Sequence, residues 1–351
     1  MSTELFIEIR NRRIGAAYAP YVIAELSCNH RGSLDRAIRL VHEALRAGAD
    51  AVKLQTFKPE THTLDVEKEE FLIKAGLWKG RSLYELYQEA VTPWEWHERL
   101  FEEAAKLGLT LFSSPGSEEA VAFLEQLGCP AYKIGSFEAV DIPLIECVGR
   151  TGKPTIISTG LITKEEIAEA VAAFRSAGGR QLALLHCVSA YPAPAEEFHL
   201  KTVSELTSQF GVVAGLSDHT LGSAVAVAAT ALGAAIVEKH MTMSRDEGGL
   251  DAAFSAEPDE MRALVQGCRI AWQAAGAAHF GPTPSSRENK LFQRSIYVCR
   301  DIPAGETFSA GNLCIVRPGF GLAPKHWREV LGRKAARPLN RGTPLDWGAV
   351  G

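Results

Sequence analysis

The segment Gly215–Asp251, GLSDHTLGSAVAVAATALGAAIVEKHMTMSRDEGGLD, decides the fold of this chain. The apolar runs Val212–Leu216 and Ala235–Val237 predict two buried strands, and Gly222–Leu232 between them predicts a helix of small residues that packs closely on a sheet. Both strands end in polar residues, SDH in the first and EKH in the second. The segment is therefore a β-α-β unit whose charged groups gather at the carboxyl ends of parallel strands, where α/β barrels keep their active sites.

Two histidines, His219 and His240, each close one of these strands beside an acid. A single histidine at such a position is more often a hydrogen-bonded core residue, but two at neighbouring strand ends favour a divalent-metal site. Imidazole and oxygen ligands suit Mn²⁺, Mg²⁺, Zn²⁺ or Fe²⁺. Only two protein ligands would leave positions open for water and a substrate carbonyl, which is a Lewis-acid arrangement.

Strand-like and helical runs alternate along most of the chain. Amphipathic segments lie between the strands, and Pro258–Ala275 predicts a last helix, so the pattern favours an α/β fold of the (β/α)8 TIM-barrel type. A doubly wound sheet would require a G-x-G-x-x-G loop after the first strand, where this chain has AELSCNHRGS. The predicted strands are Tyr21–Ser27, Ala51–Phe57, Leu109–Ser114, Ala131–Ser136, Thr155–Thr159, Leu182–Val188, Val212–Asp218 and Ile236–Thr242.

Two stretches interrupt this alternation. Lys58–Val91 is a long insertion after the second strand, with a helix predicted at Ser82–Ala90, and a loop of that length at the catalytic face usually covers or shapes the site. The other is Ala277–Asn289, whose Gly, Pro and Ser content is typical of a linker. We therefore expect a barrel domain at 1–276, a linker at 277–292, and a small second domain at 293–351 that leans on the barrel or on a second subunit.

Length, charge and cysteine content limit the classes of protein that the chain can belong to. Its 351 residues suit a barrel of about 250 residues plus an appendage, and a net charge of −5 argues against nucleic-acid binding. Seven cysteines without a C-x-x-C pair indicate buried thiols in a reducing compartment. The N-terminus lacks a signal-peptide pattern, and the most apolar stretch, Ala224–Val237, is shorter than the ~20 residues that span a bilayer. We expect a soluble, cytoplasmic protein without a nucleic-acid or membrane partner.

Lysines inside otherwise apolar strands are costly to bury unless they are paired or used. Lys53 and Lys133 are two such lysines, and with serines at the other strand ends they suit a cage for a phosphate ester. The alternative for each lysine is a structural ion pair with Glu25 or Glu238. A phosphate cage beside an open metal site predicts a phosphorylated three-carbon donor that meets a carbonyl acceptor.

Several blocks resemble the sialic acid synthase family in order and spacing, namely IAELSCNHRGSLDRA, AGADAVKLQTFKPET, YKIGSFEAVDIPLI, GKPTIISTG, LLHCVSAYPAP, GLSDHTLG and EKHMT. The tail RSIYVCRDIPAGETFSAGNLCIVRPGFGL is similar to the antifreeze-like (SAF) domain of that family. Within the family, the insertion block EEFLIKAGLWKGRSLYELYQEAVTPWEWH looks most like the branch that makes pseudaminic acid. The resemblance covers nearly the whole chain and implies a TIM barrel followed by a small C-terminal SAF domain.

The resemblance also implies a reaction, in which phosphoenolpyruvate is joined to an open-chain amino-sugar aldehyde with release of phosphate and formation of a nine-carbon 2-keto acid. In the pseudaminic branch the acceptor is 2,4-diacetamido-2,4,6-trideoxy-altrose. By resemblance, His219 and His240 would hold the metal, Mn²⁺ or Mg²⁺, against the aldehyde oxygen. Glu25 would position or deprotonate the water that attacks C2, with Glu238 and Asp251 nearby in polar roles.

The same resemblance implies the substrate contacts. Gln55 and Tyr191 would contact the acceptor, with Phe137 facing its methyl end. Arg317, in RPGFGL, matches the arginine that the SAF domain offers to the other subunit's barrel, which implies a domain-swapped homodimer. Ser189 stands where several sialic acid synthases have Asn, which favours an acceptor other than N-acetylmannosamine. The phosphate and carboxylate of phosphoenolpyruvate would be bound by Lys53, Lys133, Ser136, Ser158 and Ser217.

Three alternatives stay open at this point. A sialic or legionaminic acid synthase would run the same reaction on a different acceptor. A Schiff-base aldolase would use Lys133 or Lys239 as its nucleophile and would need no metal. A sugar- or ice-binding module on an inert barrel would need neither Glu25 nor the two histidines.

Overall fold

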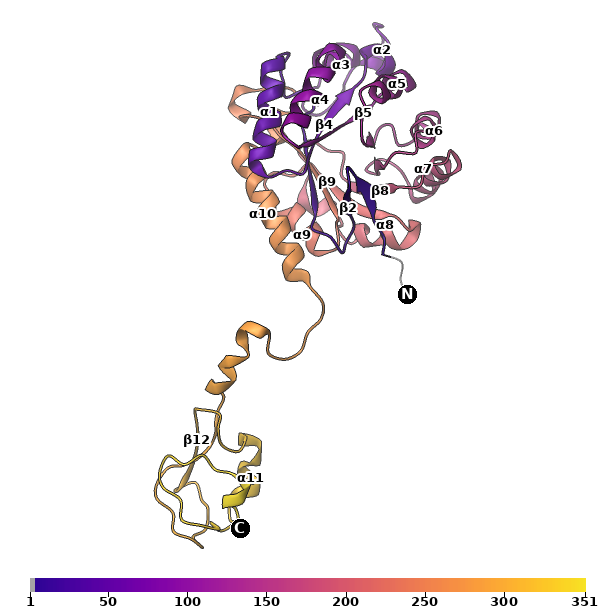
Figure 1. The fold of residues 1–351 in the computed structure, drawn as a ribbon. Coiled ribbons are helices and arrows are strands. Elements are labelled where there is room, and N and C mark those ends of the chain that lie inside the picture. The colour runs from indigo at the N-terminus through magenta and orange to yellow at the C-terminus, as the bar shows by residue number, and fades with distance from the viewer. Residues whose placement is uncertain (1–3) are drawn as a thin grey trace. The chain divides into compact units, whose positions relative to one another are not determined.

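The computed structural model describes residues 4–351 (Figure 1). The chain divides into two compact units, the first ending at Gly276 and the second spanning Ala277–Gly351. The stretch 277–292, for which we expected a linker, falls in the second unit and contains two 3-10 turns, Pro284–Ser286 and Glu288–Phe292. None of the helices within residues 4–351 combines the length and the apolar character that a membrane span requires.

Eight parallel strands close into a barrel in the first unit. Each strand pairs with the next along the chain, and the last pairs with the first to close the ring. The predicted (β/α)8 barrel is therefore confirmed, with strand ends within a few residues of those expected. The strands are β3 (Tyr21–Glu25), β4 (Ala51–Thr56), β5 (Thr110–Pro115), β6 (Tyr132–Ile134), β7 (Thr155–Ser158), β8 (Leu182–Cys187), β9 (Val213–Asp218) and β10 (Ile236–His240).

Helices alternate with these strands and surround the barrel (Figure 1). Local sequence fixes their ends: Ser33 caps the first helix by accepting a hydrogen bond from the Arg36 backbone N–H, and Gly48 ends it with φ of +85°. Each helix turns an apolar face to the barrel, as amphipathic helices do. The helices are α1 (Leu34–Ala47), α4 (His97–Lys106), α5 (Glu118–Gln126), α6 (Ile142–Arg150), α7 (Lys164–Ser176), α8 (Thr202–Phe210), α9 (Ala224–Ala231) and α10 (Pro258–Ala275).

A short hairpin precedes the barrel and had no counterpart among the predicted strands. It consists of β1 (Ile7–Ile9), which pairs antiparallel with β2 (Arg12–Ile14). Its isoleucines are buried in the core of the first unit. The Glu8 backbone N–H donates to Gln181 Oε1 at 2.6 Å, just before β8 begins. The hairpin therefore packs against the amino end of the barrel, opposite the predicted site.

The insertion after β4 forms α2 (Pro59–His62), a 3-10 turn at Glu69–Phe71 and α3 (Leu83–Ala90). Helix α3 confirms the helix predicted there. Ser82 caps it, and its side chain and that of Glu85 each accept a hydrogen bond from the other's backbone N–H. The insertion is therefore an ordered part of the carboxyl face rather than an open loop.

The second unit has a hydrophobic core of its own. Strands β11 (Ser295–Val298) and β12 (Leu313–Val316) pair antiparallel, and the short helix α11 (Trp327–Val330) packs on them through Val330. The other members of this core include Ile296, Val298, Ile302, Phe308, Leu313, Leu339 and Leu345.

Strand register determines which side chains meet at the carboxyl end of the barrel. His240 lies opposite Glu25, and Glu25 lies opposite Lys53. On the other side of β10, Glu238 lies opposite Ser217. Because successive residues of a strand point to opposite faces, Glu238 and His240 share one face of β10, with the residue between them on the other.

Candidate active site

Two lysines and two glutamates meet inside the barrel, on β3, β4, β6 and β10. Lys53 forms an ion pair with Glu25, and its Nζ lies 3.9 Å from Glu238 Oε1. Lys133 Nζ lies 3.8 Å from the same oxygen. All four side chains are buried. The structure thus brings the two predicted lysines together, and the ion pairs that the sequence offered as their alternative role are present as well.

Burial and the attraction between opposite charges shift the pKa values of these four groups in different directions. At Lys53 burial is outweighed by Glu238 and Glu25, so the pKa is raised, whereas at Lys133 burial dominates and the pKa is lowered. At Glu238 burial is outweighed by Lys133 and Lys53, and the pKa is lowered. Burial raises the pKa of Glu25 against the attraction of Lys53. Glu25 is therefore the carboxyl group of the cluster best suited to take up and release a proton.

Hydrogen bonds orient the Glu25 carboxylate. Its Oε1 accepts from the Ser27 backbone N–H at 2.8 Å and from Gln55 Nε2 at 3.3 Å, while Oε2 faces Lys53. Gln55 follows Lys53 by two residues in β4, so both side chains lie on the same face of the strand. The predicted acceptor contact Gln55 is thereby placed against the predicted base.

Two of the predicted serines lie beside the charged cluster. Ser217 Oγ donates to Glu238 Oε1 at 3.4 Å. The buried Ser158 Oγ has no hydrogen-bond partner among the described residues. Native proteins seldom leave a buried hydroxyl unpaired. An oxygen of a bound anion would satisfy this one, which fits the predicted phosphate cage.

The other two serines are joined through a glycine. Ser136 Oγ accepts from the Gly160 backbone N–H at 3.1 Å. A Cβ at position 160 would lie only 2.6 Å from Ser189 Oγ, so only glycine allows this close approach. Ser136 and Ser189 are therefore neighbours at the ends of β6 and β8.

The two predicted metal ligands are adjacent, with ring centroids of His219 and His240 5.4 Å apart. The His219 Nδ1–H donates to the Val188 carbonyl at 2.9 Å, so Nε2 carries the lone pair when the ring is neutral. At His219 burial is outweighed by the hydrogen bond and the charge of Cys187, and the pKa is raised. Burial, with the nearby charge of His219 adding to it, lowers the pKa of His240 well below its ordinary value. Its ring is therefore neutral, and its buried Nδ1 has no hydrogen-bond partner among the described residues.

These observations fit a divalent cation held by two imidazoles. A metal ligand must present a neutral ring nitrogen, and a second hydrogen bond usually fixes the tautomer. No cluster of three or more His, Cys, Asp or Glu side chains within residues 4–351 could hold a metal ion. The pair thus leaves the remaining coordination positions to water or substrate.

An aromatic wall stands beside the imidazoles, and sequence reasoning named only Tyr191 among its members. The Tyr191 ring centroid lies 4.6 Å from that of His219, and Phe254 lies 5.0 Å from both Tyr191 and His240. From the insertion, Trp78 packs on Tyr191 at 5.8 Å. The insertion therefore reaches the site, as its length led us to expect.

Asp251 lies on the loop after β10, and residues of the loop after β3 hold that loop in place. Ser27 Oγ donates to Asp251 Oδ2. Asn29 Nδ2 donates to the Met241 carbonyl and to Ser255 Oγ, both at 2.9 Å. Ser255 Oγ in turn donates to the Asp251 carbonyl at 2.6 Å. Asn29, to which the sequence gave no role, thus supports the loop that presents Asp251.

Three residues with expected roles are not among the contacts of this cluster. Phe137, on the loop after β6, is 61% exposed. Arg317 belongs to the second unit. Lys239, one of the two candidate Schiff-base lysines, is buried and bound to Asp218 Oδ2 at 2.8 Å on the opposite face of β10 from Glu238. Lys133 is therefore the only one of those two lysines within the charged cluster.

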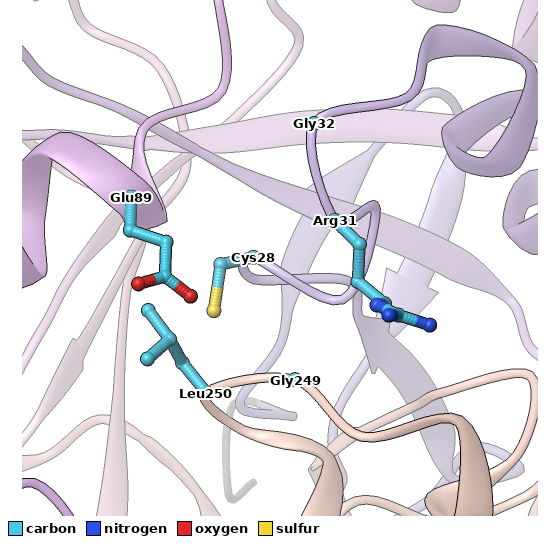
Figure 2. Close-up of a pocket in the computed structure, with 6 residues that line it drawn as sticks. All are labelled: Cys28, Arg31, Gly32, Glu89, Gly249 and Leu250. Carbon is cyan, nitrogen blue, oxygen red and sulfur yellow. The ribbon is translucent and has the colours of Figure 1, made fainter.

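A cavity of about 370 Å³ opens beside the Asp251 loop (Figure 2). It adjoins the polar site along the chain, since Cys28 follows Ser27 and Leu250 precedes Asp251. Its walls come from the loop after β3, from α3 and from the loop after β10, and they are Cys28, Arg31, Gly32, Glu89, Gly249 and Leu250.

Known proteins match this chain over nearly its whole length. The NeuB family matches residues 40–280, and the SAF domain matches residues 293–350. The pseudaminic acid synthase of Campylobacter jejuni (strain 81-176) is 43% identical over 93% of this chain and 95% of its own. The N,N'-diacetyllegionaminic acid synthase of Legionella pneumophila is 35% identical over 95% of each chain.

A solved structure agrees with these sequence matches. The N-acetylneuraminic acid (sialic acid) synthetase from Leptospira borgpetersenii, crystallised with citrate, superposes with a TM-score of 0.73 at 30% identity, over 82% of this chain and 95% of that one. The family resemblance that the sequence blocks indicated is therefore confirmed. Because the family match spans most of the barrel and the relatives align over more than nine tenths of their length, the chain belongs to the NeuB family and ends in a SAF domain.

Proposed function

We propose that this chain is a pseudaminic acid synthase, which joins phosphoenolpyruvate to 2,4-diacetamido-2,4,6-trideoxy-altrose and forms a nine-carbon 2-keto acid and phosphate. The buried cluster of two lysines and two glutamates beside paired imidazoles is the observation that supports this type of reaction. The choice of acceptor is supported by the 43% identity to a pseudaminic acid synthase, against 35% to the legionaminic acid synthase.

In this proposal the inner end of the site binds phosphoenolpyruvate. Lys53 and Lys133 neutralise its phosphate and carboxylate, and Ser158 supplies a hydroxyl that has no partner among the described residues. Ser136 and Ser217 complete the cage from the neighbouring strands. The two lysines would exchange their contacts with the glutamates for contacts with the substrate.

His219 and His240 would hold a divalent cation, Mn²⁺ or Mg²⁺, which when bound polarises the acceptor's aldehyde as a Lewis acid. His240 has the neutral ring that a metal ligand requires, and at His219 the Nδ1–H bond to Val188 leaves Nε2 for the metal, which would displace any proton there. His240→Ala should abolish turnover and weaken Mn²⁺ binding, measured by electron paramagnetic resonance, while thermal unfolding stays close to wild type. Wild-type Mn²⁺ affinity in this variant would contradict the assignment.

The reaction itself follows from the groups that face the substrates. C3 of phosphoenolpyruvate bonds to the aldehyde carbon, whose oxygen takes up a proton. Glu25, with its raised pKa, directs water to C2 and accepts the proton of that water. The bond from C2 to the bridging oxygen of the phosphate then breaks, the phosphate leaves with that oxygen and takes up the proton of the new C2 hydroxyl, and C2 becomes the ketone. Glu238 and Asp251 supply fixed polar groups around these steps, and Gln55, Ser189 and Tyr191 face the acceptor, with Phe137 at its methyl end.

We also propose that the SAF domain, residues 293–351 beyond a linker at 277–292, acts on a second copy of the chain. Arg317 would reach the acceptor in the partner's barrel, in a domain-swapped homodimer. Arg317→Ala should then raise KM for the sugar more than KM for phosphoenolpyruvate. An unchanged sugar KM would contradict this role.

The seven cysteines, all free thiols in the structure, support a place in the reducing cytoplasm.

The test of the proposed reaction is phosphate release with phosphoenolpyruvate, Mn²⁺ and each acceptor in turn, with EDTA as the control. We expect release with the diacetamido-trideoxy-altrose and little with N-acetylmannosamine or with the legionaminic acceptor. Phosphoenolpyruvate labelled with ¹⁸O at the bridging position should deliver the label to phosphate. Release with N-acetylmannosamine alone would keep the mechanism and replace the acceptor.

A Schiff-base aldolase is a second candidate, because burial lowers the pKa of Lys133 and thereby favours its nucleophilic form. It predicts irreversible loss of activity on borohydride reduction with pyruvate, and a mass increase on the peptide that contains Lys133. Full activity after that treatment excludes it.

A further inference from the structure

The cavity beside the Asp251 loop has walls of three chemical kinds. Figure 2 shows the Cys28 sulfur and the Leu250 side chain beside the Glu89 carboxylate, whereas the Arg31 guanidinium is directed away from these three groups. Cys28 and Leu250 offer apolar surface, Glu89 offers hydrogen-bond acceptors, and Arg31 offers donors. At about 370 Å³, the cavity has the size of a small-ligand pocket, for which volumes of roughly 300–1,000 Å³ are usual.

The two charged groups reach the cavity from different elements. Glu89, near the end of α3, binds Arg81 through Oε2 at 2.7 Å. Arg31 lies 3.8 Å from Glu247, beyond hydrogen-bond distance. The aliphatic part of the Arg31 side chain packs on Gly249. A Cβ added at Gly249 would lie 3.6 Å from the Cγ of Arg31. Arg31 also has φ of +51°, an uncommon conformation for a residue other than glycine.

The cavity and the place proposed for the acceptor share the loops after β3 and β10. Ser27, which precedes Cys28, donates to the Asp251 carboxylate, and Leu250 precedes Asp251. The Leu250 carbonyl accepts from Trp78 Nε1 at 3.1 Å, and Trp78 packs on Tyr191, which packs on His219. A sugar whose aldehyde lies at the imidazoles and whose chain follows the Asp251 loop would therefore reach the cavity.

An acyl-amino group matches these walls in each of its parts. Its N–H can donate to Glu89, and its methyl group can lie between Cys28 and Leu250. Its carbonyl oxygen can accept from Arg31 once this half-exposed side chain turns toward the cavity. A carboxylate would be repelled by Glu89, and an ammonium group by Arg31, so the pair selects a neutral group that both donates and accepts. A hydroxyl group would leave the apolar walls without a contact.

We infer that this cavity binds the acyl-amino substituent of the acceptor that lies farther from the aldehyde, and that it distinguishes di-N-acylated from mono-N-acylated sugars. The inference rests on the proposed function, because it presupposes a sugar with two such substituents. It assigns acceptor selection to Arg31, Glu89 and Cys28, in addition to the residues on the strands.

The test compares two variants on two acceptors. Arg31→Gly removes the donors and suits the positive φ of that position, and Glu89→Gln removes the charge and keeps the shape. Each is assayed with the 2,4-diacetamido-trideoxy-altrose and with the same sugar carrying a free amine at C4. We expect kcat/KM for the diacetamido sugar to fall roughly tenfold in Arg31→Gly, as for one lost hydrogen bond. The fall should be smaller in Glu89→Gln, whose amide oxygen still accepts but without the charge, and KM for phosphoenolpyruvate should be unchanged in both.

A third variant and a matched control complete the design. Cys28→Phe fills the cavity and should lower kcat/KM for the diacetamido sugar more than either polar change, while the free-amine sugar is less affected. Glu146→Gln is the control, because Glu146 is a half-exposed helix glutamate near an arginine, Arg150, but lies on α6. It should match wild type on both sugars.

The outcomes separate this inference from the function on which it rests. Equal changes on the two sugars, or no change on either, would overturn the inference while the wild-type enzyme still uses the diacetamido sugar. Wild-type protein that turns over only N-acetylmannosamine would overturn the proposed function, and the inference with it. A selective loss on the diacetamido sugar supports both.

Discussion

The inner and outer parts of the candidate site are held in different ways. The inner part, Lys53, Lys133, Glu25 and Glu238, stands on strands whose register is set by the closed barrel. The outer part stands on loops that touch one another through single hydrogen bonds and ring contacts, such as Trp78 to the Leu250 carbonyl. A residue on a barrel strand can seldom be substituted without disturbing the neighbouring strands, whereas a single contact between loops can be replaced without changing the rest of the site.

This difference suggests how one reaction can serve several acceptors within a family. Groups that handle the phosphorylated donor belong on the rigid strands, because charge stabilisation depends on fixed geometry. Groups that select the acceptor belong on loops, where barrel enzymes vary their specificity. The predictions below test this division, beginning with the inner cluster.

The largest effect is expected at the centre of the inner cluster. Lys53→Met leaves the Glu25 and Glu238 carboxylates with Lys133 as the remaining lysine of the cluster. We expect no measurable phosphate release and a fall in the free energy of unfolding of about 3–5 kcal/mol, because the variant leaves a buried charge uncompensated. Urea unfolding at pH 8 and a phosphate assay measure the two effects.

The matched variant combines Lys53→Met with Glu25→Gln and so removes both charges of the ion pair. It should regain most of the stability lost in the single variant and none of the activity. A double variant as unstable as the single one would show that the ion pair does not hold the inner cluster together.

The second prediction concerns the loss of folding stability at low pH, which we expect to arise at a buried histidine on the loop after β3. His30, on the loop after β3, is buried, and burial lowers its pKa to about 4. Its Nδ1 accepts from the Gly32 backbone N–H at 3.2 Å, so protonation there would oppose two donors. The unfolded chain, with an ordinary pKa of 6.5, binds this proton first. The contribution of neutral His30 to stability is therefore complete above about pH 6.5 and is lost as the pH falls toward 4.

Urea unfolding of wild type and His30→Gln between pH 7 and pH 4.5 measures this term. The free energy of unfolding of wild type should fall more steeply, by up to about 1.4 kcal/mol per pH unit, because one histidine takes up one proton on unfolding. His97, on α4, is buried with a pKa also lowered to about 4, and His97→Gln should flatten the slope in the same way. Parallel curves for wild type and both variants would contradict the assignment.

Whether the sequence predicts a feature of this structure depends on the kind of contact that forms the feature. All eight barrel strands follow from apolar runs buried on both faces, and the side chains of Lys53 and Gln55 follow from the two-residue period of a strand. The hairpin of β1 and β2 escapes this reasoning. Its strands have three residues each, and its turn places Arg10 and Asn11, rather than glycine, at positive φ.

The outer wall escapes prediction for a different reason. The hydrogen bond from Ser27 to Asp251 joins residues 224 positions apart, and neither loop has a sequence periodicity that would predict it. Phe254 beside His240 and Trp78 beside Tyr191 are likewise products of loop conformation. The family resemblance indicated Asp251 and Tyr191 but not the residues that hold them.

The third prediction tests one of these supports. Asn29→Ala removes two buried hydrogen bonds to the loop after β10. We expect a loss of about 1–3 kcal/mol in the free energy of unfolding, and a fall of roughly tenfold in kcat/KM for the acceptor. Ser255→Ala and the double variant complete the cycle. Additive effects of the two substitutions would contradict a shared role, since neighbours that share a bond should couple.

The smallest effect is expected where the outer wall rests on one hydrogen bond. Trp78→Phe removes the bond from Nε1 to the Leu250 carbonyl and leaves an aromatic ring to pack on Tyr191. A net loss of about 0.5–1.5 kcal/mol should raise KM for the acceptor roughly two- to tenfold, with KM for phosphoenolpyruvate unchanged. Trp94→Phe is the matched control, because Trp94 Nε1 makes the same kind of bond to the Phe57 carbonyl at 3.1 Å, while its ring stacks on Phe123 outside the aromatic wall. A rise in KM for phosphoenolpyruvate as large as that for the sugar would mean that the inner and outer parts are not independent, because a loop contact would then be transmitted to the strands.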